Sequence, residues 1–335
     1  MSDTLETALA DFSHLTPDLI LRLVETALGE RCSNVCRPYA SYINRVYEVG
    51  LARGEPVVAK FYRPGRWSRA ALEDEQEFVS ELAAAEISVV PPRPGTGGRL
   101  LHEHEGMCFA IFPKRGGRTL DEPTDDDWRQ IGRLIARLHV VGARRAPRDR
   151  AVIHPRRSSE GHLRFVLDAR VLPDALRARY ERAARDLLDR VAPLFDGAED
   201  IRLHGDCHRA NILHRPGEPF HLIDFDDMAV GPPVQDLWML LPGHLRESAH
   251  ALGLLLDGYE TFRPFDRASL RLIEPLRFMR FLHYTAWCAR QKADGGFARL
   301  APDWGTPGFW RAEMDEFDKQ GREIEDALSS PLPPV

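Results

Sequence analysis

Three side chains between Leu203 and Asp227 have the types and the spacing that phosphoryl transfer requires. Four residues separate Asp206 from Asn211, and Asp224 follows later in the same segment. A carboxylate can accept the proton of an attacking hydroxyl, and the spacing D-x-x-x-x-N is that of a kinase base and a metal-binding asparagine. Amide and carboxylate oxygens suit Mg²⁺, which takes further ligands from substrate phosphates. We therefore predict Asp206 as the catalytic base and Asn211 and Asp224 as Mg²⁺ ligands.

A hairpin is expected to bring the amide and the second carboxylate together. The turn at 216–219 separates two short apolar segments, and pairing Arg215 with Phe220 also pairs Asn211 with Asp224. Directly opposed residues place their Cβ atoms about 4.5–5.5 Å apart. The plain alternative is that these polar residues only cap turns on a surface hairpin. The combination of three residues at this spacing favours the catalytic interpretation.

A lysine in an apolar strand and a glutamate on the next helix could form an ion pair beside the nucleotide. Lys60 lies in the strand predicted for 57–62, where an outward edge charge would be the ordinary explanation. On the helix predicted for 69–86, Glu75 falls at the centre of the apolar face and Glu77 on the opposite face. A buried carboxylate needs a cation. We therefore predict a Lys60–Glu75 pair, with the lysine on the ATP phosphates.

The loop before the first predicted hairpin is a weaker candidate for phosphate binding. It contains no glycine motif, but its small residues Ala40 and Ser41 could let backbone N–H groups approach phosphate. Ser41 is therefore a candidate cofactor-binding residue. An ordinary polar loop would have the same sequence.

The elements that position these residues change character near residue 113. Before it, hairpins are predicted from 46–49 with 57–62 and from 99–102 with 107–112. After it, Thr124 followed by three aspartates indicates a helix start. Further helices are predicted at 173–195, 234–241, 248–262, 268–292 and 308–327. This pattern predicts a small N-terminal mixed sheet lobe followed by a larger, mainly helical C-terminal lobe.

Composition excludes several classes of protein. The 335 residues include 45 basic and 51 acidic ones, and the net charge of −6 argues against a general nucleic-acid coat protein. No apolar run approaches the roughly 18 residues that cross a bilayer, and the acidic start of the chain does not resemble a signal peptide. The five cysteines include no CxxC pair, which argues against a disulfide scaffold or a zinc finger and favours a reducing cytoplasm.

Five segments carry a family resemblance: SYxNRVYxV, VAKFYRPGRW, HGDCHxxNIL, IDFDD and GPxVQDLWMLLPG. Together they resemble the stress response kinase A family of bacterial serine/threonine protein kinases, which has the aminoglycoside/choline phosphotransferase-like fold. The resemblance covers nearly the whole chain. It implies Asp206 as proton acceptor, Asn211 and Asp224 as Mg²⁺ ligands, and Ser41 and Lys60 as ATP-site residues. One departure is Ala40, where such proteins often carry asparagine.

These observations predict an α+β, two-lobed protein-kinase-like fold, with a nucleotide-binding lobe at 1–113 and a catalytic and substrate lobe at 114–335. We expect a cytoplasmic, ATP- and Mg²⁺-dependent serine/threonine protein kinase with an unidentified protein substrate. The resemblance implies that it also phosphorylates itself and acts in a stress response. We also expect a monomer with no nucleic-acid or membrane partner. Two alternatives stay open: a phosphotransferase acting on an amino alcohol, sugar or aminoglycoside, and a nucleotide-sensing pseudokinase.

Asp236 begins a predicted helix shortly after the metal-binding segment. Its carboxylate could support the catalytic loop through backbone N–H groups, or it could only cap its own helix. The interval between Asp224 and Asp236 is too short for a long activation loop. Regulation by phosphorylation of such a loop is therefore not expected.

A group of arginines stands out in this acidic chain. A solvated connection is the simpler explanation, and recruitment of an acidic substrate is the alternative. The six residues are Arg144, Arg145, Arg148, Arg150, Arg156 and Arg157.

Overall fold

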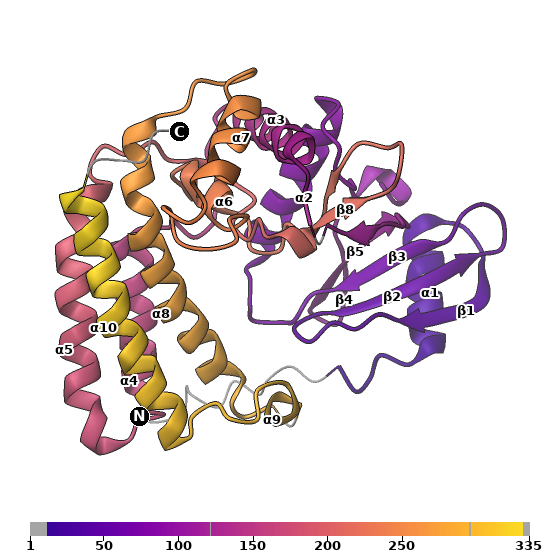
Figure 1. Ribbon diagram of the computed structural model, residues 1–335. Coiled ribbons are helices and arrows are strands. Elements are labelled where there is room, and N and C mark those ends of the chain that lie inside the picture. Colours follow the sequence, from indigo (N-terminus) through magenta and orange to yellow (C-terminus); the bar gives the residue numbers. More distant parts are fainter. Residues whose placement is uncertain (1–11, 121, 295, 331–335) are drawn as a thin grey trace. The chain divides into compact units, whose positions relative to one another are not determined.

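A computed structural model describes residues 12–120, 122–294 and 296–330, and this part of the chain forms two compact units (Figure 1). The N-terminal unit contains the described residues up to Glu122 and two later segments, 147–150 and 209–227. The C-terminal unit contains 123–146, 151–208 and the described residues from Met228 onward. Both units are thus discontinuous in sequence, whereas the predicted lobes are continuous. The assignment of nucleotide binding to 1–113 stays a prediction.

The N-terminal unit is built on a five-stranded antiparallel sheet in the order β1-β2-β3-β5-β4. Both predicted hairpins are confirmed: Val46 pairs with Lys60, and His102 pairs with Phe109. The first strand of the second hairpin was predicted too early: it covers 102–104 and not 99–102, so the turn is also tighter than expected. The strands are β1 (Cys32–Pro38), β2 (Arg45–Leu51), β3 (Val57–Phe61), β4 (His102–His104) and β5 (Met107–Pro113).

Two helices use opposite faces of this sheet. The helix α1 (Pro17–Leu28) packs Ile20 and Val24 against Ala59 and Phe61 of β3. The other face belongs to α2 (Arg69–Ala84), whose Leu72 joins a separate cluster around Tyr62. Successive side chains of a strand point to opposite faces, so this division directs Lys60 toward α2.

The helix α1 was not predicted, although its sequence carries clear end signals. The Thr16 hydroxyl accepts a hydrogen bond from the backbone N–H of Leu19, Pro17 occupies the first turn, and Gly29 ends the helix in the left-handed conformation. These are standard start and stop residues. Attention to the capping residues would have identified the helix.

The C-terminal unit is mainly helical, as predicted. The expected start at Thr124 is confirmed by a capping box with Asp127. The five later predicted helices are present: four have shorter bounds than predicted, and the last, at 307–329, is slightly longer. The helices are α3 (Asp125–Gly142), α4 (Glu160–Asp168), α5 (Asp174–Val191), α6 (Val234–Trp238), α7 (Ala249–Tyr259), α8 (Ile273–Gln291), α9 (Phe297–Leu300) and α10 (Pro307–Ser329).

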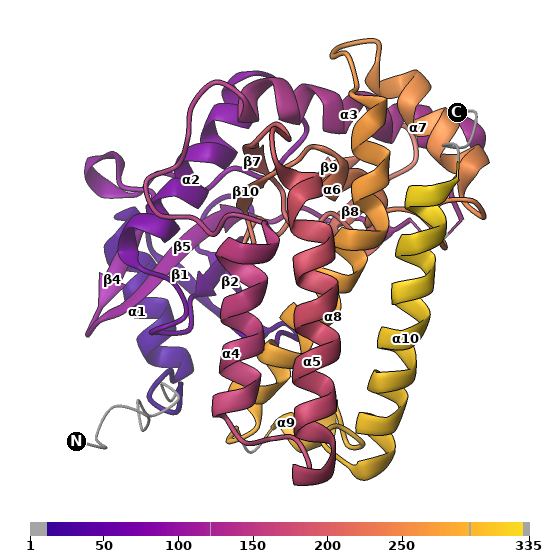
Figure 2. The same cartoon turned by 90° about the vertical axis from the view of Figure 1, so that its left-hand side faces the viewer.

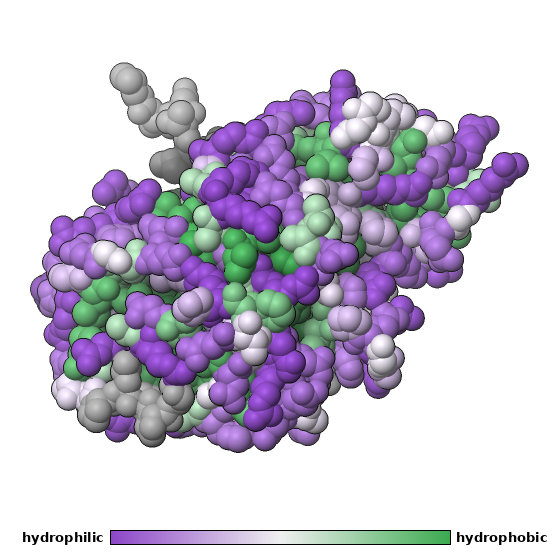
Figure 3. Space-filling model, turned by 90° about the horizontal axis from the view of Figure 1, so that it is seen from above, coloured by the Kyte–Doolittle hydropathy of each residue, from purple (hydrophilic) through white to green (hydrophobic). Residues whose placement is uncertain are grey.

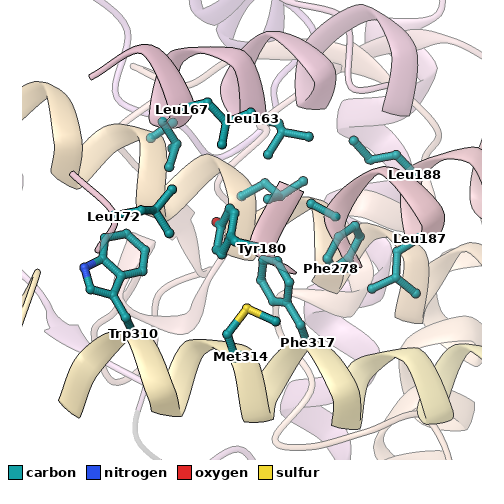
Figure 4. Packing of buried hydrophobic residues seen from close by; sticks show 14 of the residues in the cluster. Leu163, Leu167, Leu172, Tyr180, Leu187, Leu188, Phe278, Trp310, Met314 and Phe317 are labelled. Atoms are coloured by element: carbon teal, nitrogen blue, oxygen red, sulfur yellow. The ribbon is translucent and has the colours of Figure 1, made fainter. Parts of the chain in front are cut away.

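Four of these helices, α4, α5, α8 and α10, lie side by side as a bundle (Figures 1 and 2). Its interior is apolar and rich in aromatic rings: Tyr180 of α5 contacts Trp310 and Phe317 of α10, and Phe278 of α8 packs edge-on against Phe317 (Figure 4). Aromatic pairs of this kind add to the free energy gained by burial. The bundle packs one face of α8, and the other face of α8 presents residues to solvent.

The surface is mainly hydrophilic, as the high content of charged residues suggests. The face shown in Figure 3 is mostly hydrophilic, and its apolar residues gather in several separate patches. Across the described ranges, no helix combines the length and the apolar character needed to span a membrane. All five cysteines are free thiols.

The helices α3 and α7 pack backbone against backbone through glycines. A Cβ atom added to Gly132 would lie 2.0 Å from the carbonyl oxygen of Leu255, and one added to Gly258 would lie 2.0 Å from the carbonyl oxygen of Arg129. Neither contact can be relieved by rotating a side chain. Glycine at these positions is therefore required by the spacing of the two helices.

We expect Gly132→Ala to lower the free energy of unfolding by about 1–3 kcal/mol, the usual effect of overpacking. Urea unfolding followed by tryptophan fluorescence measures it. Gly253→Ala in α7 is the matched control, because a Cβ atom there meets nothing within 4 Å. The control should leave stability unchanged or raise it by up to about 1 kcal/mol. Equal effects of the two substitutions would refute the packing argument.

Candidate active site

Lys60 is the centre of a charged cluster in the N-terminal unit. Its Nζ lies 2.8 Å from Asp224 Oδ1, 3.4 Å from Asp226 Oδ1 and 3.9 Å from Glu75 Oε1. Burial lowers the pKa of Lys60, but the neighbouring carboxylates outweigh this effect and raise its pKa well above the usual value. The ammonium group is therefore charged at any physiological pH, and it is held beside the carboxylate predicted to bind metal.

The structure distinguishes Glu75 from Glu77 as helix periodicity predicted. The Glu75 side chain is 3% exposed and points toward β3, whereas that of Glu77 is 42% exposed and binds Arg148 at 2.7 Å. Glu75 also accepts hydrogen bonds from Tyr62 Oη at 3.0 Å and Arg150 Nη2 at 3.1 Å. Burial raises the pKa of Glu75, and the two nearby cations oppose this effect. Lys60 and Glu75 thus belong to a larger cluster than the predicted pair.

The prediction of a solvated arginine-rich connection was wrong at Arg150. Its side chain is fully buried and stacks over the Trp67 ring. Its hydrogen bonds include those to the carbonyl oxygens of Ala71 (2.8 Å) and Asp226 (2.9 Å) and to Glu75 Oε2 (3.1 Å). Arg150 therefore joins α2 to the segment that contains Asp224. Composition gave no means of separating this arginine from its exposed neighbours.

The predicted register of the 211–224 hairpin was wrong by one residue. The strands β8 (Ile212–His214) and β9 (His221–Leu222) pair Ile212 with Leu222, and Ile223 N donates to the carbonyl oxygen of Asn211 at 3.0 Å. The turn closes one residue earlier than predicted, with Glu218 N bonded to the carbonyl oxygen of Arg215. A slip of one residue turns a side chain to the other face of the ribbon, so Asn211 and Asp224 are not cross-strand partners.

Asp224 reaches the cluster through its own backbone conformation. Its φ of 61° lies in the left-handed region, which aspartate tolerates better than most residues. Its side chain is 54% exposed although it contacts Lys60. Unusual backbone conformations of this kind concentrate at functional sites. The strand register therefore failed to locate Asp224, and its role as a metal ligand stays a prediction.

The oxygen donors in this part of the N-terminal unit are of the kind that Mg²⁺ prefers. Asn211 is buried at the end of the 3₁₀ turn Arg209–Asn211, just before the hairpin. Asp226 Oδ1 is buried, and its contact with Lys60 at 3.4 Å is an ion pair without hydrogen-bond geometry. The donor set of amide and carboxylate oxygens therefore fits a hard divalent cation.

The loop that contains Ser41 connects β1 to β2, so it is the turn of a hairpin and does not precede the first one. Two arginines hold its carbonyl oxygens: Arg63 Nε donates to Ile43 at 2.9 Å, and Arg45 Nη1 donates to Tyr42 at 3.1 Å. Ser41 itself is half-buried. A loop between two strands of this sheet is a suitable position for contacts to phosphate.

Asp206 belongs to the C-terminal unit and lies between two donors. Arg280 Nη2 donates to its Oδ1 at 2.8 Å, and His208 Nε2 lies 3.5 Å from its Oδ2. Burial raises the pKa of Asp206, but the hydrogen bond from His208 and the charge of Arg280 outweigh it and hold the pKa well below the usual range. Asp206 is therefore ionised at neutral pH and able to accept a proton.

Asp236 supports the loop that carries Asp206, which confirms the first of the two roles predicted for it. Its Oδ2 accepts a hydrogen bond from His204 N at 2.8 Å, and its Oδ1 accepts one from Gly205 N at 2.9 Å. His139 Nε2 lies 3.1 Å from Oδ2, and the other ring nitrogen of His139 lies 2.9 Å from Tyr259 Oη. This buried network fixes the backbone immediately before Asp206. His139 and Tyr259 carried no sequence signal apart from being polar residues on apolar helix faces.

Comparison with known proteins places this geometry in a family. Residues 35–273 match the phosphotransferase enzyme family. The chain belongs to the phosphotransferase enzyme family. Within it, stress response kinase A of Escherichia coli strain K12 is 35% identical over 318 residues, which are 94% of this chain and 95% of the relative. Serine/threonine protein kinase RdoA of Salmonella typhimurium is 36% identical over 297 residues, which are 86% of this chain and 88% of the relative. The predicted resemblance is confirmed.

Solved structures of phosphotransferases have the same fold. The amicoumacin kinase hAmiN, in complex with AMP-PNP and Ca²⁺, superposes with a TM-score of 0.69 at 18% identity and covers 95% of both chains. A microcompartment-associated aminopropanol kinase also gives 0.69, at 19% identity over 92% of this chain and all of the other. At this identity the likeness concerns the fold alone, and it confirms the predicted α+β, two-lobed protein-kinase-like class.

Proposed function

We propose that this kinase-like phosphotransferase is an ATP- and Mg²⁺-dependent serine/threonine protein kinase. The family and its relatives support phosphoryl transfer. The serine/threonine specificity is supported by the name of the RdoA relative, which is 36% identical. The name of the stress response relatives also supports a role in a stress response. The five free thiols favour a reducing compartment such as the cytoplasm.

One observation carries the proposal: Lys60 on β3 is held by Glu75 of α2 and by Asp224. This is the arrangement of charges by which kinases hold the phosphates of ATP. In our proposal Lys60 contacts the nucleotide phosphates, Glu75 fixes the lysine, and Ser41 contributes to the phosphate-binding loop. The hAmiN structure, which has this fold and holds AMP-PNP with Ca²⁺, supports the use of a nucleotide and a divalent cation.

Asn211 and Asp224 would hold the metal ion. Bound Mg²⁺ would neutralise charge on the phosphates. Lys60 neutralises Asp224 directly at 2.8 Å, and a metal ion held by Asp224 would share that role. Asp206 accepts the proton of the acceptor hydroxyl and directs its oxygen at the phosphorus. The low pKa of Asp206 suits orientation of the hydroxyl better than early proton removal.

Labelled phosphate transfer tests the proposal. The protein is incubated with γ-labelled ATP and Mg²⁺, first alone and with dephosphorylated casein, then with ethanolamine, sugars and aminoglycosides. We expect label on serine or threonine of the protein acceptors. Transfer to a small alcohol without label on any protein would favour the small-molecule alternative, which the aminopropanol kinase of the same fold also suggests. ATP binding without any transfer would favour the pseudokinase alternative.

A further inference from the structure

Arg280 contacts the proposed base Asp206, but it does not belong to the charged cluster around Lys60. It projects from α8, where it is 33% exposed, and its bond to Asp206 uses a single nitrogen. Within the part of the chain that the structure describes, this is the one hydrogen bond that the Arg280 side chain makes. A guanidinium group has five N–H donors in a planar fork. Arg280 can therefore bind a second anionic group while it still contacts Asp206.

A second arginine on the same helix, Arg277, differs because its guanidinium group is held by contacts within the protein. Arg277, one turn earlier, stacks over the Trp238 ring and donates to the carbonyl oxygen of Gly243 at 2.9 Å. Its Nε also lies 3.3 Å from Glu274. The guanidinium of Arg277 is thus used within the protein, whereas Arg280 faces solvent beside the base.

Two aromatic rings extend the surface from Arg280 along α8. Tyr284 is 49% exposed and stacks on Trp287, with 5.9 Å between ring centroids and 15° between planes. At 100° per residue, Arg280, Tyr284 and Trp287 fall within about 60° of the helix circumference. We call these three residues the α8 stripe. Tyr284 and Trp287 lie about 6 and 10 Å beyond Arg280 along the helix axis, which two or three extended residues can span.

We propose that the α8 stripe selects the acceptor: Arg280 binds a carboxylate next to the acceptor serine or threonine, and Tyr284 and Trp287 contact the residues that follow. This inference rests on the proposed protein kinase function and adds the substrate class, an acidic polypeptide. Charge complementarity supports this inference. Arg280 is a cation hydrogen-bonded to Asp206, and its remaining N–H donors are available to an acidic group of the substrate. A carboxylate next to the acceptor serine or threonine would make a bidentate contact with Arg280, whose guanidinium also orients Asp206.

A peptide library tests the substrate class. Serine peptides with Glu, Gln or Lys fixed at one flanking position at a time are phosphorylated with γ-labelled ATP, and kcat/KM is compared between members. We expect the protein to favour Glu over Gln by about tenfold at an adjacent position, as for one charge-assisted hydrogen bond. Arg280→Gln should reduce this ratio to about one, Arg280→Lys should keep part of it, and Arg280→Glu should favour Lys.

The ratio is measured within each variant, so a smaller fraction of folded enzyme does not change it. Arg277→Gln is the matched control, with the same change of charge one turn away, and it should keep the preference for Glu. A Glu/Gln ratio in Arg280→Gln equal to that of the unmodified protein would overturn this inference and leave the protein kinase function intact. Label on no peptide or protein, with transfer to a small alcohol, would overturn both.

Discussion

Asp206→Asn is expected to lower kcat for phosphoryl transfer by about 10²–10⁴-fold, the usual contribution of a general base. The amide has nearly the shape of the carboxylate and can still accept a hydrogen bond from Arg280, but it cannot take up the proton of the acceptor hydroxyl. Affinity for ATP should be retained, because Lys60 and Glu75 belong to the N-terminal unit. Single-turnover transfer with labelled ATP, together with a nucleotide-binding titration, separates the two effects.

The control for this variant is Asp200→Asn, the same chemical change at an exposed position of the C-terminal unit. It should leave both the rate and ATP affinity unchanged. If Asp206→Asn keeps more than about a tenth of the original rate, its contribution falls below that of a general base. Asp206 would then not be the proton acceptor.

Arg150→Met is expected to lower the free energy of unfolding by about 3–5 kcal/mol, because it removes the arginine of a buried ion pair and leaves the Glu75 carboxylate without that partner. The substitution also removes the hydrogen bonds that join Ala71 of α2 to Asp226. Phosphoryl transfer should therefore fall as well, since Lys60 and Glu75 would no longer be held in one arrangement. Urea unfolding measures the first effect and labelled transfer the second.

A double variant distinguishes loss of the charge pair from a general packing defect. Adding Glu75→Gln to Arg150→Met removes the unpaired carboxylate, so part of the lost stability should return. Activity should not return, because Glu75 is proposed to fix Lys60. Arg144→Met is the matched control at an exposed position of the same arginine-rich segment, where surface substitutions usually change stability by less than about 0.5 kcal/mol. A double variant no more stable than Arg150→Met would contradict the ion-pair explanation.

Sequence patterns predicted the features that depend on local periodicity. The phase of α2 placed Glu75 toward the sheet because sixteen helical residues repeat the same apolar stripe. The β2–β3 hairpin was equally clear, since its alternation fixes which side of β3 carries Lys60. Capping residues also defined the start of α3. Each of these signals extends over many residues, so one ambiguous position does not change the result.

Features that depend on a single turn or on distant contacts could not be predicted in this way. The register of the 211–224 hairpin depends on where a short turn closes, and a shift of one position moved Asn211 opposite Ile223. Arg150 reaches Glu75 across 75 positions of sequence, and no periodicity links them. The backbone conformation of Asp224 is likewise set by its surroundings. The roles proposed for Ser41, Lys60, Glu75, Asp206, Asn211 and Asp224 await the experiments described above.

The discontinuity of the N-terminal unit has a consequence for how the protein is made. Lys60 and Glu75 leave the ribosome early, but Arg150 and Asp224 follow much later in the chain. The roughly 100 residues between Glu122 and Asp227 take on the order of 5–20 seconds to synthesise. During this interval Lys60 and Glu75 have each other, but Arg150 is added only part-way through and Asp224 only at its end. The nascent sheet therefore completes the charged cluster around Lys60 only after residues 123–146 and 151–208 of the helical unit have been translated.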